Sequence, residues 1–401
     1  MKLIMKCAII LTMFLVAGFS TDEQTVDVAK VFSDAEQQTR LMLQNIPSAK
    51  KGNSDLVSPR TLENGELKLV ASRDWTSGFF PGQLWFLYEF TGKDEWKQQA
   101  RNFTANIERE KTNAGTHDMG FKVYSSFGNG YRLTKDASYR DIIIQSAKTL
   151  STRFRPIIGC IRSWDHHREQ WGFPVIIDNM MNLELLFEAT RLTGDSSFHR
   201  IAVTHANTTM KNHYRPDHSS WHVVDYDTIT GKVVKKETHQ GYAHESAWSR
   251  GQAWGLYGFT MCYRETKDAT YLRHAENIAA FIFSHKNMPK DLVPYYDFDA
   301  PGIPNEPRDA SAAAIAAAAL YELSTYSKNA KQYRSTADKI VESLTNIYRS
   351  PLGESKGFIL LHSTGSKPGK FEIDVPINYA DYYYLESLLR SKKLKEGKAL
   401  F

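Results

Sequence analysis

Four charged side chains and a tryptophan recur at the same phase along the chain. Each of them lies 15 or 16 residues before the threonine of a repeated turn phrase; they are Trp75, Asp118, Asp178, Arg250 and Asp309. If a helix separates each one from its threonine, all five lie at one end of the molecule, because each residue adds about 1.5 Å along a helix axis. Carboxylates, an arginine and tryptophan would then surround a single opening.

Further aromatic and imidazole side chains crowd the same loop ends. They are Trp164, His222, His244 and Trp248. A lone aspartate at a helix start is usually an N-cap, which the helix dipole favours, so capping is the alternative role for each aspartate taken singly. Asp118 and Asp178, however, lie among apolar residues rather than in a polar loop. Two such carboxylates beside several tryptophans and histidines fit a carbohydrate site better.

The repeated phrase predicts a series of helical hairpins. Each copy has an aspartate or asparagine within four residues of its threonine and an aromatic residue soon after. An apolar helical stretch precedes each copy and an amphipathic one follows, which is typical of a tight turn whose Thr or Asp caps the second helix. The copies begin at Thr91, Thr134, Thr193, Thr266 and Thr325.

The two chain ends supply a sixth hairpin. Residues 26–46 and 379–391 each have a helical pattern without a partner nearby in sequence. Six hairpins predict an all-α fold, an (α/α)6 toroid barrel with six inner helices surrounded by six outer ones. The inner set should be the more apolar, and the alanine-rich residues 309–320 suit it because small side chains permit close packing. One barrel domain would span residues 21–401.

One long loop departs from the helical pattern. Val223-Val224 and Val233-Val234 flank Thr230-Gly231 within residues 221–238. Pairs of β-branched residues on either side of a turn sequence are typical of two paired strands. We therefore expect a small β-hairpin inserted in this loop.

The composition excludes several classes of protein. Of the 401 residues, 42% are apolar and 24% charged, which argues against a disordered, collagen-like or coiled-coil chain. A net charge of +5 without a run of basic residues gives no sign of nucleic-acid binding. Asp165-His166-His167 lacks the helical ligand pair of a metal site, and no phosphate-binding loop or nucleophile elbow occurs. The sequence predicts no cofactor and no metal.

The first twenty residues have the pattern of a signal peptide. Lys2 and Lys6 precede an apolar run from Cys7 to Val16, and small residues follow up to Ser20. The run is too short to span a membrane, and no cysteine follows it that could carry a lipid anchor. We expect cleavage near Ser20 and a periplasmic or secreted protein without a membrane anchor.

Six segments together resemble glycoside hydrolase family 88, the unsaturated glucuronyl hydrolases. They follow the family order from Arg73 to Leu389, and the set is specific although no single segment is. The segments are residues 73–82, 117–121, 175–183, 238–242, 248–254 and 373–382. The resemblance implies an (α/α)6 barrel, in agreement with the hairpin count.

The resemblance also implies a reaction. Family members remove a 4,5-unsaturated uronic acid from the non-reducing end of the small oligosaccharides that lyases leave when they cut glycosaminoglycans. The reaction resembles hydration of a vinyl ether: a proton is added at C4, water attacks C5, and the resulting hemiketal opens with loss of the glycosidic bond.

By this resemblance Asp178 is the acid and base of both steps, and Asp118 binds sugar hydroxyls and tunes Asp178. A proton donor needs a raised pKa, whereas a helix N-terminus lowers the pKa of a carboxyl group, so burial and the charge of Asp118 would have to prevail. Arg250 would pair with the uronate carboxylate. The substrate-binding positions implied are Trp75, His117, Trp164, His222, Gln240, Trp248, Arg250 and Trp254.

Two other functions are alternatives. An unsaturated rhamnogalacturonyl hydrolase acting on pectin fragments would share the barrel and the hydration chemistry, but its motifs around the acids differ from residues 117–121. A catalytically inactive sugar-binding barrel would normally lose Asp118 or Asp178, and both are present.

The loop at residues 362–370 is a possible anion site. It combines glycines, small hydroxyl residues and two lysines, which could present N–H groups and positive charge to a sulfate on the leaving sugar. Ser363, Ser366 and Lys367 would be the contacts. The alternative is an ordinary solvated turn, since the same residue types also favour turns.

Overall fold

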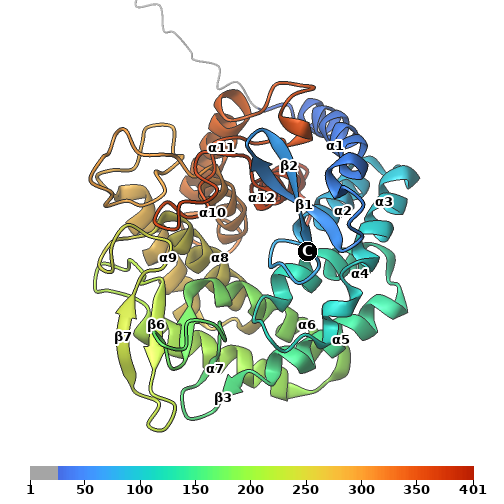
Figure 1. The fold of residues 1–401 in the computed structure, drawn as a ribbon. Helices are drawn as coiled ribbons and strands as arrows, with labels where there is room; N and C mark the ends of the chain where they lie inside the picture. The colour runs from blue at the N-terminus through green and yellow to red at the C-terminus, as the bar shows by residue number, and fades with distance from the viewer. Residues whose placement is uncertain (1–25) are drawn as a thin grey trace, which may run out of the picture.

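The computed structural model describes residues 26–401, whose helices form two concentric rings (Figure 1). The inner ring consists of α2 (Phe79–Thr91), η2 with α4 (Gly120–Gly128, Asn129–Thr134), η3 with α6 (Ile177–Asn182, Leu183–Thr193), α8 (Ser249–Thr266), α10 (Ala310–Leu323) and α12 (Asn378–Lys395). The outer ring consists of α1 (Val28–Lys50), α3 (Asp94–Ala105), α5 (Ala137–Ser151), α7 (Ser196–Asn212), α9 (Ala269–Ser284) and α11 (Ala330–Ile347). The predicted (α/α)6 barrel is confirmed.

The ring closes through the two ends of the chain. Helix α12 packs against α10 on one side and α2 on the other, and α1 contacts both α2 and α12 from outside. The unpartnered helical stretches at the two ends therefore form the sixth hairpin, as the sequence predicts. The expected signal peptide, residues 1–20, lies outside the described residues.

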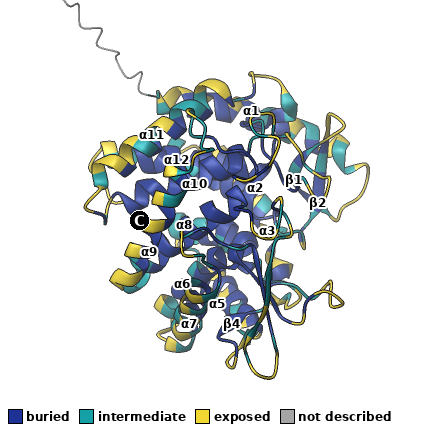
Figure 2. Cartoon of the chain, turned by 90° about the vertical axis from the view of Figure 1, so that its left-hand side faces the viewer, coloured by how far each residue is buried: buried dark blue, intermediate teal, exposed yellow. Residues whose placement is uncertain are grey.

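The inner helices form the core of the barrel. Every residue of α10 is buried, and α2 is buried from Phe79 through Leu87 (Figure 2). Outer helices bury one stripe only; in α11 the buried residues are Tyr333, Ala337, Ile340, Val341 and Leu344. This difference follows from position, since an inner helix contacts protein on all sides and an outer helix on one. None of the helices within residues 26–401 is both long enough and apolar enough to cross a membrane.

Aspartates of the turn phrase begin the outer helices. Asp136, Asp195 and Asp268 accept hydrogen bonds from the backbone N–H two residues ahead and cap α5, α7 and α9. Helices α3 and α11 start without a side-chain cap. In five of the six pairs a short turn thus joins the inner helix to the outer one, which places the starts of these inner helices at the same end of the barrel.

The strands lie at that end. β6 (Val223–Tyr226) and β7 (Val233–Glu237) form the predicted hairpin, and β5 (Pro174–Ile176) adds a third antiparallel strand beside β6. The structure also has a hairpin of β1 (Leu56–Glu63) and β2 (Glu66–Ala71) and a short pair, β3 (Phe154–Arg155) and β4 (Cys160–Ile161), which were not predicted. Asn64-Gly65 joins β1 to β2 with positive φ at both residues, and this dipeptide is a recognisable hairpin signal.

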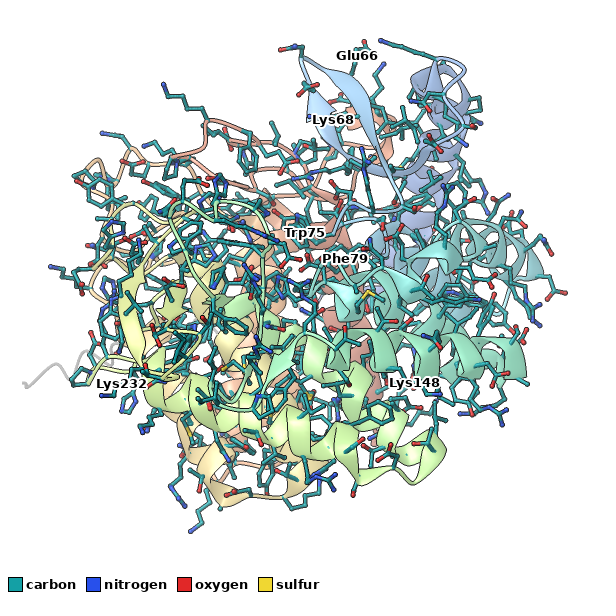
Figure 3. All side chains as sticks on the ribbon, turned by 60° about the horizontal axis from the view of Figure 1, so that its bottom comes forward. Glu66, Lys68, Trp75, Phe79, Lys148 and Lys232 are labelled. Atoms are coloured by element: carbon teal, nitrogen blue, oxygen red, sulfur yellow. The ribbon has the colours of Figure 1, made fainter. Side chains whose placement is uncertain are left out.

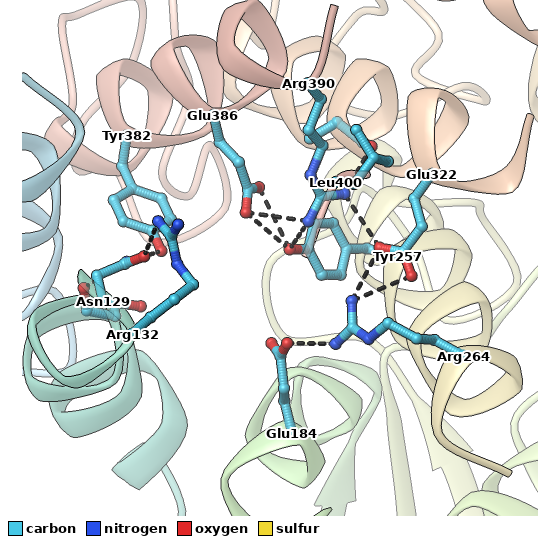
Figure 4. Close-up of polar contacts among 12 residues, drawn as sticks. Asn129, Arg132, Glu184, Tyr257, Arg264, Glu322, Tyr382, Glu386, Arg390 and Leu400 are labelled. Atoms are coloured by element: carbon cyan, nitrogen blue, oxygen red, sulfur yellow. Dashed lines mark hydrogen bonds and ion pairs between the residues drawn. The ribbon is translucent and has the colours of Figure 1, made fainter. Parts of the chain in front are cut away.

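The opposite end of the barrel contains a network of ion pairs (Figure 4). Arg264 contacts Glu184 and Glu322, with 3.0 Å between Nη1 and Glu322 Oε1, and Arg390 donates to Glu322 and to the Tyr257 hydroxyl. The ring of Phe401 covers the Arg264 guanidinium at 4.0 Å. Paired charges thus occupy most of this end, and a cavity of about 100 Å³ remains beside them, lined by Glu184, Tyr257 and Arg390 among others.

Replacing Arg264 by methionine should destabilise the protein strongly. The substitution removes this cation from the buried Glu322 and the partly buried Glu184, and breaking a buried pair costs about 3–5 kcal/mol. Urea unfolding would measure the free energy of unfolding. Arg140→Ala is the control, because its ion pair with Asp141 is exposed and should contribute little. Equal losses in the two variants would show that the network does not stabilise the barrel.

Candidate active site

A cavity of about 160 Å³ opens at the end where the inner helices begin. Six predicted site residues line it: Trp75, His117, Asp118, Trp164, Asp178 and Gln240. Figure 3 labels Trp75 and Phe79, whose rings meet edge to face at the rim of α2 with 5.9 Å between centroids. Of the five residues with the same spacing from a turn, Trp75, Asp118 and Asp178 thus meet at one cavity, whereas Arg250 and Asp309 do not line it.

Asp178 lies in the first turn of η3, inside the cavity wall. Its side chain caps no helix and the residue is 7% exposed. Burial raises the pKa of Asp178 to about 7, and the charge of Asp118 acts in the same direction. Arg250, the backbone N–H of Asp178 and the Trp254 indole oppose the rise. Desolvation thus prevails over the groups that favour the ionised carboxylate, and Asp178 can hold a proton near neutral pH.

Asp118 lies two residues before η2 and is more open than Asp178. Its Oδ2 accepts a hydrogen bond from Thr116 Oγ1 at 2.8 Å, and its backbone carbonyl accepts from the N–H of Lys122. The side chain is 16% exposed and caps no helix. By contrast, Asp309 is an N-cap: it accepts from the backbone N–H groups of Ser311 and Ala312 at the start of α10. The N-cap alternative therefore holds for Asp309 alone.

A buried histidine faces each of the two aspartates. His117 Nε2 lies 3.2 Å from Asp118 Oδ1, and His222 Nε2 lies 3.7 Å from Asp178 Oδ2. Burial lowers the pKa of both imidazoles, so both rings are neutral at pH 7. The His222 Nδ1 accepts from the backbone N–H groups of His239 and Gln240, each at 3.2 Å.

Aromatic rings form two walls of the cavity. Trp75 packs against Phe121 and Tyr379, with centroid distances of 5.4 and 5.0 Å. Trp164 stacks on His166 at 5.4 Å, and His239 meets Trp164 edge to face at 5.1 Å. Flat, weakly polar walls of this kind suit the faces of sugar rings. Trp254 lies behind the wall with its ring 5.1 Å from Phe121, and its N–H faces Asp178 without regular hydrogen-bond geometry.

Arg250 is committed to protein groups rather than open to a substrate carboxylate. Its guanidinium is 1% exposed and donates to Asp309 Oδ2 at 2.7 Å, to the Thr364 carbonyl and to the Gly365 carbonyl. Trp248 covers it at 4.6 Å. This arrangement differs from the expected pairing of Arg250 with a uronate carboxylate. Arg250 instead holds the loop at Gly365 in place, and its charge lowers the pKa of Asp178.

The loop at residues 362–370 also differs from the expectation. Ser363 is fully buried and pairs with Val375 through the backbone, while the Ser366 hydroxyl accepts from the Gly369 N–H within a turn. Lys367 pairs with Glu306. Ser363 and Ser366 are thus not presented to a sulfate, because the loop folds back on itself through isolated bridges from Ser363 to Val375 and from Ser366 to Phe371. Gly365 is the residue of this loop that lines the cavity.

Several lining residues were not predicted from the sequence. Arg60 on β1 joins the loops of the rim, with 2.9 Å between Nη2 and Glu372 Oε2 and 2.7 Å between Nη1 and Asp74 Oδ2. The Asn64-Gly65 dipeptide could have predicted the β1–β2 hairpin that carries Arg60. The remainder are Phe121, His166, Ile176, His239, Phe371, Glu372 and Tyr379. Asp165, next to His166, pairs with Arg153 at 2.7 Å.

The fold and site agree with one known family. A model of glycosyl hydrolase family 88 matches residues 51–386. The chain belongs to this family. An unsaturated glucuronyl hydrolase of Formosa agariphila is 53% identical over 327 residues, which are 81% of this chain and 82% of that protein. One from Bacillus sp. GL1 is 34% identical over 80% of this chain and 86% of its own length.

Solved family 88 structures superpose over nearly the whole chain. An unsaturated glucuronyl hydrolase specific for heparin matches with a TM-score of 0.86 and 45% identity, covering 91% of this chain and 98% of that one. The Bacillus sp. GL1 enzyme, described as responsible for the degradation of glycosaminoglycan, matches with a TM-score of 0.84 and 30% identity, covering 92% and 97%. These family members share the helical barrel described above.

Proposed function

We propose that the cavity removes a 4,5-unsaturated uronic acid from the non-reducing end of a glycosaminoglycan oligosaccharide. Asp178 carries the proposal, because a buried carboxyl group with a pKa of about 7 can give and take a proton near neutral pH. Its proton goes to C4 of the conjugated alkene, and positive charge develops at C5 beside the ring oxygen. The carboxylate then accepts a proton from the water that attacks C5, which restores the acid.

The other cavity groups have supporting roles in this reaction. Asp118, which is partly exposed to the cavity, binds sugar hydroxyls and raises the pKa of Asp178. Trp75 and Trp164 bind the ring faces, and His222 directs its Nε2 toward Asp178. The C5 hemiketal opens to a ketone, and the resulting open chain releases the second sugar as the glycosidic bond breaks.

Relatives favour glycosaminoglycan fragments over pectin fragments as the substrate. The 45% identical structural neighbour is specific for heparin, and relatives from three Streptococcus species, 30–31% identical, are unsaturated chondroitin disaccharide hydrolases. The alternative of a rhamnogalacturonyl hydrolase has no such support. A catalytically inactive sugar-binding barrel is disfavoured by the paired aspartates and the raised pKa of Asp178.

Loss of ultraviolet absorbance from the conjugated alkene tests the activity directly. Unsaturated disaccharides of the chondroitin, hyaluronan, heparin and rhamnogalacturonan types should be compared at equal concentration. We expect turnover of at least one glycosaminoglycan type and little or none of the rhamnogalacturonan type. Absence of turnover on every glycosaminoglycan substrate would contradict the proposal. Absence of turnover on all four substrates would favour the alternative of a catalytically inactive sugar-binding barrel.

Lys367→Ala should have a small effect on the use of sulfated substrates. Lys367 is 39% exposed, pairs with Glu306 and lies outside the cavity lining, so the change in kcat/KM should be less than about fivefold. The measurement compares sulfated and unsulfated unsaturated disaccharides, with Lys370→Ala on the same loop as the control. A larger loss confined to the sulfated substrate would restore the role in sulfate binding that the sequence suggested.

The start of the sequence supports export. We infer a periplasmic or secreted enzyme, because the basic and apolar residues before Ser20 have the pattern of a cleaved signal. N-terminal sequencing of the protein recovered from its native cells should give a start near Thr21. Recovery of an intact Met1 from the cytoplasm would contradict export.

A further inference from the structure

Asn182 joins the two segments that carry the aspartates. It is fully buried, lies four residues after Asp178 on η3, and contacts the start of η2. Its Oδ1 accepts hydrogen bonds from the backbone N–H of Gly120 at 2.8 Å and of Phe121 at 3.2 Å. This amide therefore satisfies two N–H groups in the first turn of η2 that have no partner within the helix.

The other end of the same amide determines how His117 is protonated. Because Oδ1 faces two N–H donors, the amide nitrogen is the atom that faces His117, with 3.4 Å between Nδ2 and the imidazole Nδ1. An amide nitrogen can only donate, so His117 Nδ1 must accept. A neutral imidazole has one proton, and that proton must then be on Nε2.

The Nε2 proton lies where it can act on Asp118. Nε2 is 3.2 Å from Asp118 Oδ1, although not in regular hydrogen-bond geometry, and Thr116 donates to the other oxygen of the carboxylate. Asp118 Oδ1 thus faces the N–H group of His117, and Asp118 Oδ2 accepts from the Thr116 hydroxyl. If the proton moved to Nδ1, a nitrogen lone pair would face the Asp118 oxygen, and two acceptors would oppose each other.

We propose that Asn182 is a positioning residue, which holds His117 in the Nε2–H tautomer and so keeps an N–H group directed at the Asp118 carboxyl group during catalysis. The inference rests on the proposed roles of Asp118 and Asp178. The other charged groups that act on His117 are Arg153 and Lys122, and Lys122 is paired with Glu110 at 2.9 Å. The Asn179 side chain also acts on His117, and it raises the pKa of the imidazole, so it accepts from the ring rather than donating to it.

His222 has the same arrangement built from backbone. Its Nδ1 accepts from the N–H groups of His239 and Gln240, so its single proton lies on Nε2, the atom that faces Asp178. Each aspartate is therefore faced by a neutral histidine in the same tautomer. The tautomer of His117 is fixed by the side chain of Asn182, so a point mutation can change it, whereas that of His222 is fixed by backbone N–H groups.

Gly120 permits the close approach that the arrangement needs. A Cβ at this position would lie 2.6 Å from the Asn182 Cα and 2.8 Å from its Oδ1. Any side chain here would push η2 away from Asn182 and break both hydrogen bonds. The two segments are thus in contact at a point where only glycine fits.

Asn182→Asp separates the two functions of the amide. A carboxylate of the same shape can still accept from Gly120 and Phe121 but cannot donate to His117. Two-bond ¹H–¹⁵N correlation spectra show which ring nitrogen of His117 carries the proton in the protein without substrate. The His117 signals are assigned by their loss in His117→Gln. The matched control is Asn129→Asp, which places a carboxylate on the neighbouring inner helix, at the start of α4 and beside Arg132.

We expect wild type to have a bare Nδ1, Asn182→Asp to have a protonated Nδ1, and kcat to fall about 10-fold or more while the melting temperature changes little. Asn129→Asp should change neither the ring nor kcat. A protonated Nδ1 in wild type, an unchanged ring in Asn182→Asp, or a changed ring with full activity would each overturn the inference. The ring signals need no substrate, so they are informative even if the proposed reaction is wrong.

Discussion

Asp178→Asn should lower kcat by at least ~10²-fold, the usual worth of a positioned acid or base. The substitution removes the proton that the mechanism delivers to C4 and the carboxylate that then accepts one from water. Asparagine resembles the neutral acid in shape and charge, and burial favours that neutral form at this position. The fold and KM should therefore change little, and the loss should appear in kcat.

The ultraviolet assay measures this variant beside Asp309→Asn, a buried aspartate at the same end of the barrel that caps α10. We expect Asp309→Asn to lower the free energy of unfolding and to have a smaller effect on kcat than Asp178→Asn. Asp178→Asn with most of the wild-type kcat and an unchanged pH profile would show that another group transfers the proton.

Asp118→Asn should both slow the enzyme and move its pH profile. We expect a loss of roughly 10- to 100-fold in kcat/KM, the range of one charge-assisted hydrogen bond to a sugar hydroxyl. In wild type the protonated form of Asp178 is the active one, so kcat/KM should fall as the pH rises through about 7. The charge of Asp118 raises the pKa of Asp178, so its removal should move this fall to lower pH.

The pH dependence of kcat/KM checks the second prediction, because it reports the titration of groups in the free enzyme. A fall that stays at the wild-type pH would mean that Asp118 acts on the substrate alone. A shift to higher pH would contradict the electrostatic coupling of the two aspartates.

Much of the barrel could be predicted because its turns repeat in sequence. The threonine and aspartate of each turn are local signals, and Asp136, Asp195 and Asp268 cap outer helices as expected. The common distance from each turn also placed Asp118 and Asp178 at one end. These inferences needed only the length of a helix and its direction.

The partners of individual side chains could not be predicted in this way. Arg250 matches the pattern of a substrate-binding residue, but its donors reach the carbonyls of Thr364 and Gly365, whose positions depend on how a distant loop folds. Ser363 is buried because the same loop pairs with Val375. Contacts between a side chain and a distant backbone group leave no periodic signal, and the role of Asn182 was hidden for the same reason.

Turnover of an unsaturated disaccharide in D₂O tests the central claim most directly. Asp178 is fixed on one side of the cavity, so its exchanged deuteron should reach C4 from one face. We predict that NMR of the product at early times shows deuterium at C4 in a single stereochemical configuration, and that Asp178→Asn gives almost no such product. Release of the unsaturated sugar with its alkene intact, followed by deuteration on both faces, would contradict hydration by Asp178.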